Sequence, residues 1–574
     1  MRIFKKKAIF LYIVIGLILA GVLLLTCRLL YINRHYGLSQ WAKQQIEIRK
    51  DGLFNTSYYF VNNDKRYIVS NDEFDSCDVK QIDVKDGMLY MVNHARGYRI
   101  AFPKGVKFEL DASNEFICAK TDEYSITVSK EFSPYEGTRA YIEEYINKFL
   151  LDERFQSQNK IKIHKNAVEK INDLWVQVMF AERTSAPMSD IEKNVYAYCY
   201  IYDKEQRYYR VMVKAKEYNR EFIDTVYKML YSFELDLPIT GQMQNTTDYH
   251  PIENPKWNKE TREFYHSLLN SDTLKWGIYV PQGVRDLHFD EVEKIEDKID
   301  YTFDGMIEYL YYWEDFPSEG MQKAYDRGKI VEVTVQCSTV MNEELNGWSP
   351  AFDILDGVCD DDIRRFARAA KEFSHPFLFR LNNEMNSDWT SYCASILMND
   401  PELYQELWKR YYRIFEEEGV NNAIWIFNPN DNTFPPCGYN DPKAYYPGNA
   451  YVHVFGVTGY NTGTYYAETF GEKWREFEDL YDEAYTLFDV EFGKFPWIIT
   501  EFASSSVGGD KVQWINNMFD VLPKYKNIKM AFWFNSADWD PNYPKETVVS
   551  RPYWLDETDE TLSAFGKRVK NTLK

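Results

Sequence analysis

The feature that most constrains the fold is a series of short apolar runs in the C-terminal half of the chain. From Lys275 onward these strand-length runs alternate with helical patterns, as in βα units built around a parallel sheet. Eight runs occur, at residues 276–280, 306–311, 330–335, 377–381, 423–427, 452–457, 497–500 and 530–534. Eight strands with helices between them, in about 300 residues, predict a (β/α)8 TIM barrel with its functional residues at the C-terminal strand ends.

Two of the intervening helices carry clear start and stop signals. Three aspartates at residues 360–362 offer caps before an apolar face that begins at Ile363, and Asp400 with Pro401 opens a second helix that Gly419 ends. Both segments repeat their apolar residues at helical spacing, so each is expected to cover the barrel with one face.

Two glutamates follow strands where a barrel places its chemistry. Glu384 follows the fourth strand and Glu501 follows the seventh. Retaining cleavage of a glycosidic bond uses one carboxylic acid and one nucleophilic carboxylate about 5 Å apart, which two strands of a barrel can supply. A single glutamate at a strand end is more often a solvated or salt-bridged residue, but the pairing of two at these strands favours catalysis.

The motifs around these glutamates resemble the clan A glycoside hydrolases, and within them glycoside hydrolase family 26, which holds β-mannanases and some β-glucanases and xylanases. The resemblance spans about residues 275–540 and rests on residues 277–281, 380–386 with Trp389, 425–430, 446–448, 456–461 and 500–502. It implies that Glu384 is the general acid/base and Glu501 the nucleophile. Asn383 stands where the family's mannanases commonly have His, and Thr458 where they commonly have Asp, so mannan specificity is not implied.

Three further residues are expected to support the site. Tyr460 matches the family's tyrosine that hydrogen-bonds the nucleophile, and Asn383 precedes the acid/base. Arg380 has the strand parity of Glu384. Inside a barrel Arg380 needs carboxylate partners, either to tune the site or as a structural ion pair.

Several tryptophans are expected at the same rim. Trp533 ends the eighth strand, while Trp348, Trp389 and Trp539 lie in strand-following segments. Flat rings there can cover the apolar faces of sugars, although core packing competes for any single tryptophan. His453 has no second ligand at metal-binding spacing, so we expect neither a metal nor a cofactor.

Residues 8–27 form an uncharged apolar run of about twenty residues, long enough for a helix to cross a bilayer. Four basic residues precede it and two follow closely, which places the N-terminus in the cytoplasm. We therefore predict a cytoplasmic stub and transmembrane helix at residues 1–34, with the remainder extracellular. A cleaved signal peptide is the competing interpretation.

The segment between this helix and the barrel mixes strand and helix patterns. Residues 50–237 are predicted to form an α+β domain of unknown role, residues 238–255 a polar linker, and residues 256–574 the catalytic domain. Residues 250–574 are expected to fold and retain catalysis without the preceding domain, because the barrel carries its own core and both carboxylates.

A formal net charge of −21 argues against nucleic-acid binding, which draws on clustered Lys and Arg, whereas a neutral polysaccharide is unaffected. The prediction is a membrane-anchored, extracellular, retaining endo-β-glycanase of the β-mannanase type. A transglycosylase fits the same residues, as does a catalytically weak scaffold that binds glycans or handles exopolysaccharide. The identity of the polysaccharide stays open.

Overall fold

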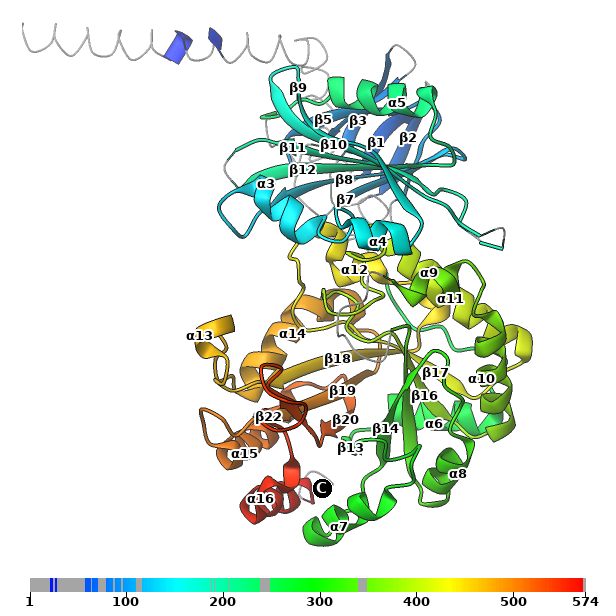
Figure 1. Ribbon diagram of the computed structural model, residues 1–574, viewed down its shortest axis with the longest axis vertical. Helices are drawn as coiled ribbons and strands as arrows, with labels where there is room; N and C mark the ends of the chain where they lie inside the picture. Colours follow the sequence, from blue (N-terminus) through cyan, green and yellow to red (C-terminus); the bar gives the residue numbers. More distant parts are fainter. Residues whose placement is uncertain are drawn as a thin grey trace, which may run out of the picture. The chain divides into compact units, whose positions relative to one another are not determined.

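The computed structural model of the protein (Figure 1) describes residues 21–23, 26–27, 57–62, 65–70, 79–85, 88–93, 96–109, 116–186, 188–189, 191–204, 206–237, 248–338 and 348–570. They form two compact units. The first contains the described residues of Met1–Glu131, His164–Phe180 and Val195–Thr247, and the second those of Phe132–Ile163, Ala181–Asn194 and Asp248–Lys574.

The predicted membrane helix and most of the predicted linker lie outside the described residues. Of residues 8–27, only 21–23 and 26–27 are described, and these are helical. Among the helices that the structure describes, none combines the length and the apolar character needed to cross a bilayer. Residues 238–247 of the predicted linker are not described either.

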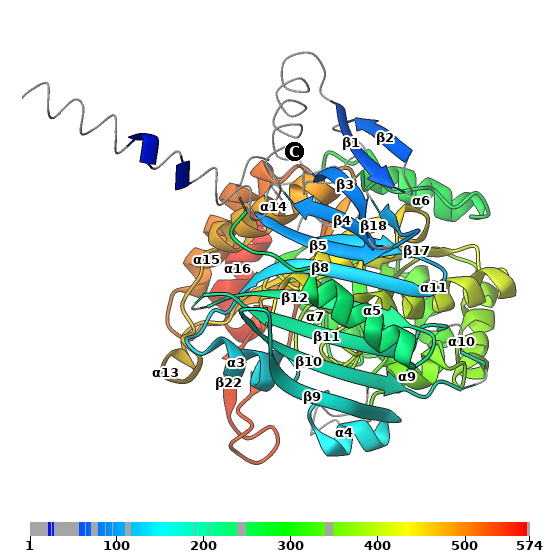
Figure 2. The ribbon, with the colours of Figure 1, turned by 90° about the horizontal axis from the view of Figure 1, so that it is seen from above.

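The first unit is built on antiparallel strands. Its strands are β1 (Ser57–Asn62), β2 (Lys65–Ser70), β3 (Val79–Lys85), β4 (Met88–Asn93), β5 (Tyr98–Pro103), β6 (Lys107–Glu109), β7 (Phe116–Lys120), β8 (Tyr124–Phe132), β9 (Ile161–Ile171), β10 (Leu174–Arg183), β11 (Val195–Tyr202) and β12 (Arg207–Ala215). The largest sheet has the order β6-β7-β8-β12-β11-β10-β9, beside the sheets β3-β4-β5 and β1-β2. Helix α5 (Arg220–Tyr231) lies along one face of the large sheet (Figure 2) and buries Phe222, Val226 and Met229 in its core.

The second unit is a closed barrel of eight parallel strands, as the sequence predicts. The strands are β13 (Lys275–Tyr279), β14 (Gly305–Tyr311), β15 (Ile330–Gln336), β16 (Phe377–Leu381), β17 (Ala423–Phe427), β18 (Val454–Asn461), β19 (Trp497–Ser504) and β20 (Ile528–Phe534). Pairing of β13 with β20, where Ile278 lies opposite Trp533, closes the ring. All eight predicted runs coincide with these strands to within a few residues at their ends.

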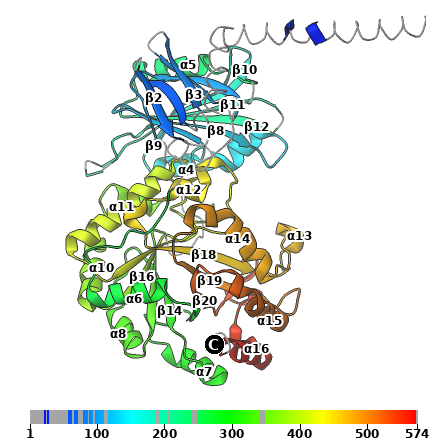
Figure 3. The same ribbon diagram turned by 180° about the vertical axis from the view of Figure 1, so that it is seen from behind.

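Helices surround the barrel (Figure 3). They are α6 (Lys259–Leu269), α7 (Phe289–Ile299), α8 (Ser318–Asp326), α9 (Pro350–Leu355), α10 (Asp360–Phe373), α11 (Pro401–Glu418), α12 (Pro442–Tyr445), α13 (Ala467–Phe470), α14 (Phe477–Phe492), α15 (Lys511–Val521) and α16 (Asp559–Val569). Short 3-10 turns lie at Gly438–Asn440, Asn449–Tyr451, Leu522–Lys524 and Leu555–Glu557, and β21 (Ala537–Trp539) pairs with β22 (Val549–Pro552) in a hairpin after β20.

The helix signals act largely as predicted. The Asp400 side chain accepts a hydrogen bond from the Glu402 backbone N–H, Pro401 occupies the first turn of α11, and Gly419 ends the helix at φ 79°. In α10 the cap is Cys359 rather than an aspartate. The aspartates at 360–362 lie one position later, in the first turn, where their charge favours the helix dipole.

Strand alternation gives the barrel an inner and an outer core. Inward side chains, including Ile307, Leu378, Ile426, Ile498 and Phe532, form one buried cluster with residues of α6. The Trp257 indole N–H, just before α6, donates to the Ala423 carbonyl at the start of β17. The segment that leads into α6 therefore closes the N-terminal end of the barrel, and the opposite end stays open.

Two segments that the sequence assigns to residues 50–237 belong to the barrel unit. The first, residues 132–163, carries α3 (Thr138–Tyr141), a π-helical turn (Ile142–Ile146) and α4 (Glu153–Gln158). Asn399 donates to Asn147, and the Ser349 N–H donates to Asn159. The second segment is Ala181–Asn194. Its Arg183 forms a bidentate ion pair with Asp356, and both side chains are almost fully buried.

Candidate active site

A cavity of about 1000 Å³ opens at the C-terminal end of the barrel. The last residues of three strands line it, namely Tyr279 of β13, Gln336 of β15 and Phe534 of β20. The remaining lining residues are Tyr309, Asn383, Glu384, Trp389, Asn430, Tyr460, Thr462, Tyr466, Thr469, Phe470, Glu501, Asp538, Trp539, Pro541, Asn542, Ser550, Arg551 and Tyr553. Both predicted carboxylates therefore face one cavity.

Glu384 leaves β16 through a constrained turn. Its φ of 56° lies in the left-handed region, which is uncommon for a residue with a long side chain, and strained backbone positions cluster at active sites. Its backbone N–H donates to the Asn428 carbonyl at 2.8 Å, and Ser387 donates two hydrogen bonds back to its carbonyl. These contacts fix the direction in which the side chain enters the cavity.

The environment of Glu384 favours its protonated form. The side chain is only 8% exposed. Burial raises the pKa of Glu384 well above its usual range, and the negative charge of Glu501 acts in the same direction. Arg380 and a hydrogen bond with Asn430 oppose the shift of this pKa without cancelling it.

Glu501 enters the cavity because β19 contains an irregularity. Ile498 points into the barrel. In the pairing of β19 with β18, Ile499 lies opposite Val457 and the next pair is Glu501 with Thr458. Thr500 therefore has no partner in β18 and is an extra residue in β19. Thr500 also faces inward, where its hydroxyl contacts Thr458. Simple alternation from Ile498 would turn Glu501 outward; the bulge directs two consecutive side chains inward.

Four donors converge on the Glu501 carboxylate. Oε2 accepts from the Tyr309 hydroxyl at 2.5 Å and from the Tyr460 hydroxyl at 2.9 Å. Oε1 accepts from Arg380 Nη1 at 2.9 Å and from Asn383 Nδ2 at 3.4 Å. Burial raises the pKa of both phenols well above the usual value, so they stay protonated and donate. Hydrogen bonds of this kind stabilise a negative charge on Glu501.

Arg380 combines the two roles that its strand position allows. Its guanidinium is fully buried and contacts two carboxylates, Glu501 through Nη1 and Glu332 through Nε at 2.7 Å. It also donates to Asn428 and to the Tyr309 hydroxyl, each at 2.9 Å. Arg380 is thus both a buried ion-pair partner and a donor that orients the candidate nucleophile.

The sequence reading missed three members of this network. Tyr309 has the inward parity of Ile307 in β14, which is the signal that could have identified it. Glu332 is fully buried inside β15, a charge in the middle of an apolar run. Asn428 lies in the motif of residues 425–430, but the sequence indicates no role for it. In the structure its side chain bridges Arg380 to the Thr458 hydroxyl.

The predicted tryptophans divide into two groups. Trp389 is 40% exposed and lines the cavity, as does Trp539. Trp533 is fully buried, packs against Phe502, Trp514 and Phe565, and donates to the Tyr553 carbonyl. Its expected place at the rim is wrong, because β20 alternation turns it toward the helices while Phe534 takes the cavity side. Trp348 donates to Asp353 and does not line the cavity either.

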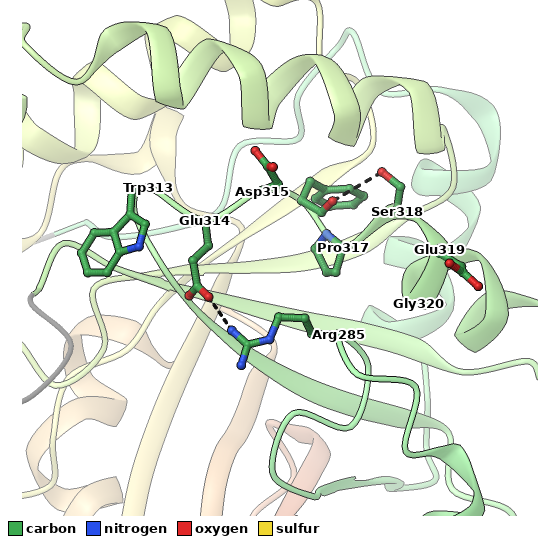
Figure 4. Close-up of a pocket in the computed structure, with 9 residues that line it drawn as sticks. Arg285, Trp313, Glu314, Asp315, Pro317, Ser318, Glu319 and Gly320 are labelled. Atoms are coloured by element: carbon green, nitrogen blue, oxygen red, sulfur yellow. Dashed lines mark hydrogen bonds and ion pairs between the residues drawn. The ribbon is translucent and has the colours of Figure 1, made fainter.

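A second, smaller cavity of about 400 Å³ shares no lining residue with the first. It lies along residues 313–320, where Figure 4 shows the Arg285 side chain reaching Glu314 in an ion pair. Trp313 stacks on Tyr311 with the ring planes 5° apart. Arg285 and Glu314 neutralise each other, and this cavity contains neither predicted catalytic residue.

No cluster of three or more His, Cys, Asp or Glu side chains arranged for a metal ion occurs within the described part of the chain. His453 is fully buried, and its Nδ1 accepts from the Trp425 backbone N–H. Burial lowers the pKa of His453 to about 3, which keeps the ring neutral. His453 is a core histidine.

Residues 225–485 match the family model described as Glycosyl hydrolase family 26. This match identifies residues 225–485, which hold strands β13 to β18 of the barrel, as a family 26 segment. The matched residues include Glu384 but end before Glu501, so the assignment of Glu501 depends on the strand geometry described above.

Curated relatives agree with the family. The chain is 30% identical over 237 residues to Endoglucanase H of Acetivibrio thermocellus, which covers 39% of this chain and 24% of the relative. It is 34% identical over 195 residues to a mannan endo-1,4-beta-mannosidase of Bacillus subtilis, covering 30% of this chain and 48% of the relative. The chain thus spans less than half the length of either relative.

Solved structures of family 26 proteins are also similar. The catalytic domain of a Bacillus sp. JAMB-750 endo-beta-1,4-mannanase has 15% identity and a TM-score of 0.42, covering 57% of this chain and 93% of that one. A beta-mannanase from Bacteroides ovatus has 14% identity and a TM-score of 0.41, covering 55% and 94%.

Proposed function

We propose that this protein is a retaining endo-β-glycanase in which Glu501 is the nucleophile and Glu384 the general acid/base. The observation that carries the proposal is the opposite environment of two carboxyl groups that face one cavity. Both carboxyl groups are buried, but burial raises the pKa of Glu384 well above its usual range, whereas four hydrogen-bond donors converge on the Glu501 carboxylate. Two carboxyl groups whose environments differ in this way are the usual basis for separate acid and nucleophile roles.

The reaction follows from these roles. A Glu501 oxygen attacks the anomeric carbon while the Glu384 proton passes to the glycosidic oxygen, so the leaving sugar departs as a neutral alcohol. Glu384 is then a carboxylate and removes a proton from the water that attacks the glycosyl ester. The C–O bond to Glu501 breaks, and the carboxylate returns to its four donors. Two displacements leave the anomeric configuration unchanged.

The substrate class follows from the cavity and the family. The cavity volume of about 1000 Å³ is at the upper end of the range for small-ligand sites, so it fits several sugar residues better than one. The names of the two relatives indicate endo-acting cleavage of a glucan and of a β-1,4-mannan. We include both polymers as candidate substrates, since Asn383 and Thr458 depart from the mannanase pattern.

The decisive experiment compares Glu501→Ala with Glu384→Ala on an aryl β-glycoside whose leaving group needs no protonation. Glu501→Ala should lose turnover, and azide should restore activity with a glycosyl azide of inverted configuration. Glu384→Ala should form the intermediate but hydrolyse it slowly, and azide should give retained configuration. Inverted product from the unmutated enzyme would rule out the covalent role of Glu501. Products longer than the substrate would identify a transglycosylase.

We also propose that residues 8–27 anchor the protein in a membrane with the barrel outside the cell. The proposal rests on the length of this apolar run and on the basic residues before it. A reporter active only outside the cytoplasm should work when fused after Asn245 and fail when fused at Lys7. Recovery of most of the protein as a shortened soluble form would show instead a cleaved signal peptide.

A further inference from the structure

Two loops beyond the catalytic carboxylates present aromatic rings to the cavity. The first follows β18 and contains α13, which ends at Phe470 (Figure 1). The second is the β21–β22 hairpin, which carries Trp539. Both rings line the cavity that contains Glu384 and Glu501. Phe470 is 72% exposed and Trp539 is 37% exposed, so neither ring is used to fill a core.

Three contacts tie these loops together. Arg551 of the hairpin pairs with Glu472 after α13, and its guanidinium lies 5.0 Å from the centre of the Tyr466 ring. The Tyr465 hydroxyl donates to Asp540 at 2.9 Å. These charged and aromatic contacts between the two loops restrict how far the loop with Phe470 and the hairpin with Trp539 can move relative to each other. A ligand therefore meets a surface that loses little further freedom on binding.

The charges on this wall select a neutral ligand. Among the described residues that line the cavity, the charged ones besides the two catalytic carboxylates are Asp538 and Arg551. Arg551 is already paired with Asp538 at 2.7 Å and with Glu472. Within the described part of the lining, no cation is left to bind an acidic sugar, while Thr462, Asn542 and Ser550 offer hydroxyl and amide groups.

We propose that Phe470 and Trp539 form a distal platform for a neutral β-glycan chain and determine the preference of the enzyme for polymers over short substrates. Exposed rings flanked by hydroxyl and amide groups suit a ligand with apolar faces and polar edges, which describes a pyranose ring. The inference rests on the proposed function, because the same chain must also reach Glu384 and Glu501.

The test uses the full chain and three variants, Phe470→Ala, Trp539→Ala and Tyr543→Ala. Tyr543 is the matched control, since it lies on the same hairpin, is 53% exposed and does not line the cavity. The probes are an unbranched β-1,4-mannan, the neutral hydroxyethylcellulose and the aryl β-disaccharides of mannose and glucose. For Phe470→Ala and Trp539→Ala, the ratio of kcat/KM on polymer to kcat/KM on aryl disaccharide should fall about tenfold, the loss of one stacking contact of about 1.4 kcal/mol.

Migration in native gels that contain the same polymers gives a second reading without turnover. The unmutated protein and Tyr543→Ala should be retarded equally, and Phe470→Ala and Trp539→Ala less. An unchanged polymer preference in both platform variants, with a fully active unmutated enzyme, would overturn the platform alone. Absence of cleavage by the unmutated enzyme on all four probes would overturn the proposed function instead. Selective retardation by an acidic polysaccharide would contradict the neutral ligand.

Discussion

At the scale of single residues, the hydrogen bonds to Glu501 bear unequally on the two chemical steps. In the proposed mechanism, formation of the glycosyl ester removes the charge of Glu501, and hydrolysis restores it. The donors Tyr309, Tyr460, Arg380 and Asn383 therefore stabilise the carboxylate that leaves in the second step. Their loss should slow breakdown of the intermediate more than its formation.

Tyr309→Phe should accordingly make hydrolysis of the intermediate limiting. A hydrogen bond to a charged group contributes about 1.5 to 3 kcal/mol, so the second step should slow by roughly 10- to 100-fold. Rapid mixing with an aryl glycoside should then show a burst of released aryl alcohol that the unmutated enzyme lacks. Tyr404→Phe is the control, because its buried hydroxyl contacts only backbone carbonyls of residues 381 and 382. Equal slowing without a burst would contradict the argument.

Glu332 should make the stability of the barrel depend on pH. Burial raises the pKa of Glu332 from 4.5 to about 7, with Arg380 opposing the shift and Glu501 adding to it. Between these values the folded protein keeps a proton that the unfolded chain loses. The contribution of Glu332 to stability therefore falls as pH rises from about 4.5 to 7, by about 3 kcal/mol.

Glu332→Gln should remove this contribution to the pH dependence. The amide keeps the size of the side chain and has no charge to lose or gain. The free energy of unfolding of the variant, relative to the unmutated protein, should rise between pH 5 and pH 8 when both are measured by urea denaturation. Parallel pH profiles for the two proteins would show that Glu332 is already ionised at pH 5.

The residue scale also shows what sequence patterns reveal of a site. Glu384, Glu501 and Tyr460 were identifiable because each belongs to a local motif at a strand end. For Tyr309 the sequence offers only its inward parity in β14, and neither its role nor that of Glu332 follows from a local motif, because both depend on which residues the barrel closure brings opposite each other. Trp533 was misplaced for a different reason. It lies one residue before the end of β20, and this position in the strand turns its side chain away from the cavity.

At the scale of elements, β18 and β19 approach each other closely where the bulge lies. A side chain at Gly456 would meet Ile426, Thr500 and Asn428 at 2.7, 2.8 and 2.9 Å. Asn428 bonds Arg380, and Thr500 is the extra residue before Glu501. The glycine thus leaves room both for the bulge and for the partner of Arg380.

Gly456→Ala should therefore lower stability and turnover together. Overpacking of a core site costs about 1 to 3 kcal/mol, and the displaced groups here support Glu501 and Arg380. Gly459→Ala on the same strand is the control, since an added methyl there meets its nearest atom at an ordinary 3.6 Å. Thermal unfolding and kcat measured on both variants decide the matter. Equal unfolding temperatures and equal kcat values for the two variants would show that the barrel accommodates the added methyl group at residue 456 without losing stability or turnover.

At the scale of the whole molecule, local patterns gave the barrel but not the limits of its unit. Each strand is a short apolar run, so eight of them could be counted along the chain. The contacts of residues 132–163 and 181–194 join positions more than 150 residues apart, as in the pairing of Arg183 with Asp356, and no local pattern records them. The sequence therefore predicted a linear boundary where the compact unit is discontinuous.

This arrangement changes the expected behaviour of the isolated barrel. A fragment of residues 250–574 lacks Arg183 and so leaves Asp356, which is 0% exposed, without the ion pair that compensates its charge. Removing one partner of a buried pair costs about 3 to 5 kcal/mol. The fragment should unfold at a lower temperature than residues 50–574. Below that temperature it should keep its turnover, since both carboxylates remain in place, and turnover should be lost when the fragment unfolds.

The variant Asp356→Asn separates this cause from the other lost contacts. In the fragment it removes an unpaired buried charge, so it should raise the unfolding temperature. In residues 50–574 the same substitution breaks the pair with Arg183 and should lower it. Opposite signs in the two backgrounds, measured by calorimetry, are what a buried ion pair requires. The same sign in both would mean that Asp356 acts through its other contacts, and a fragment as stable as the longer chain would mean that residues 132–163 and 181–194 contribute nothing to the barrel.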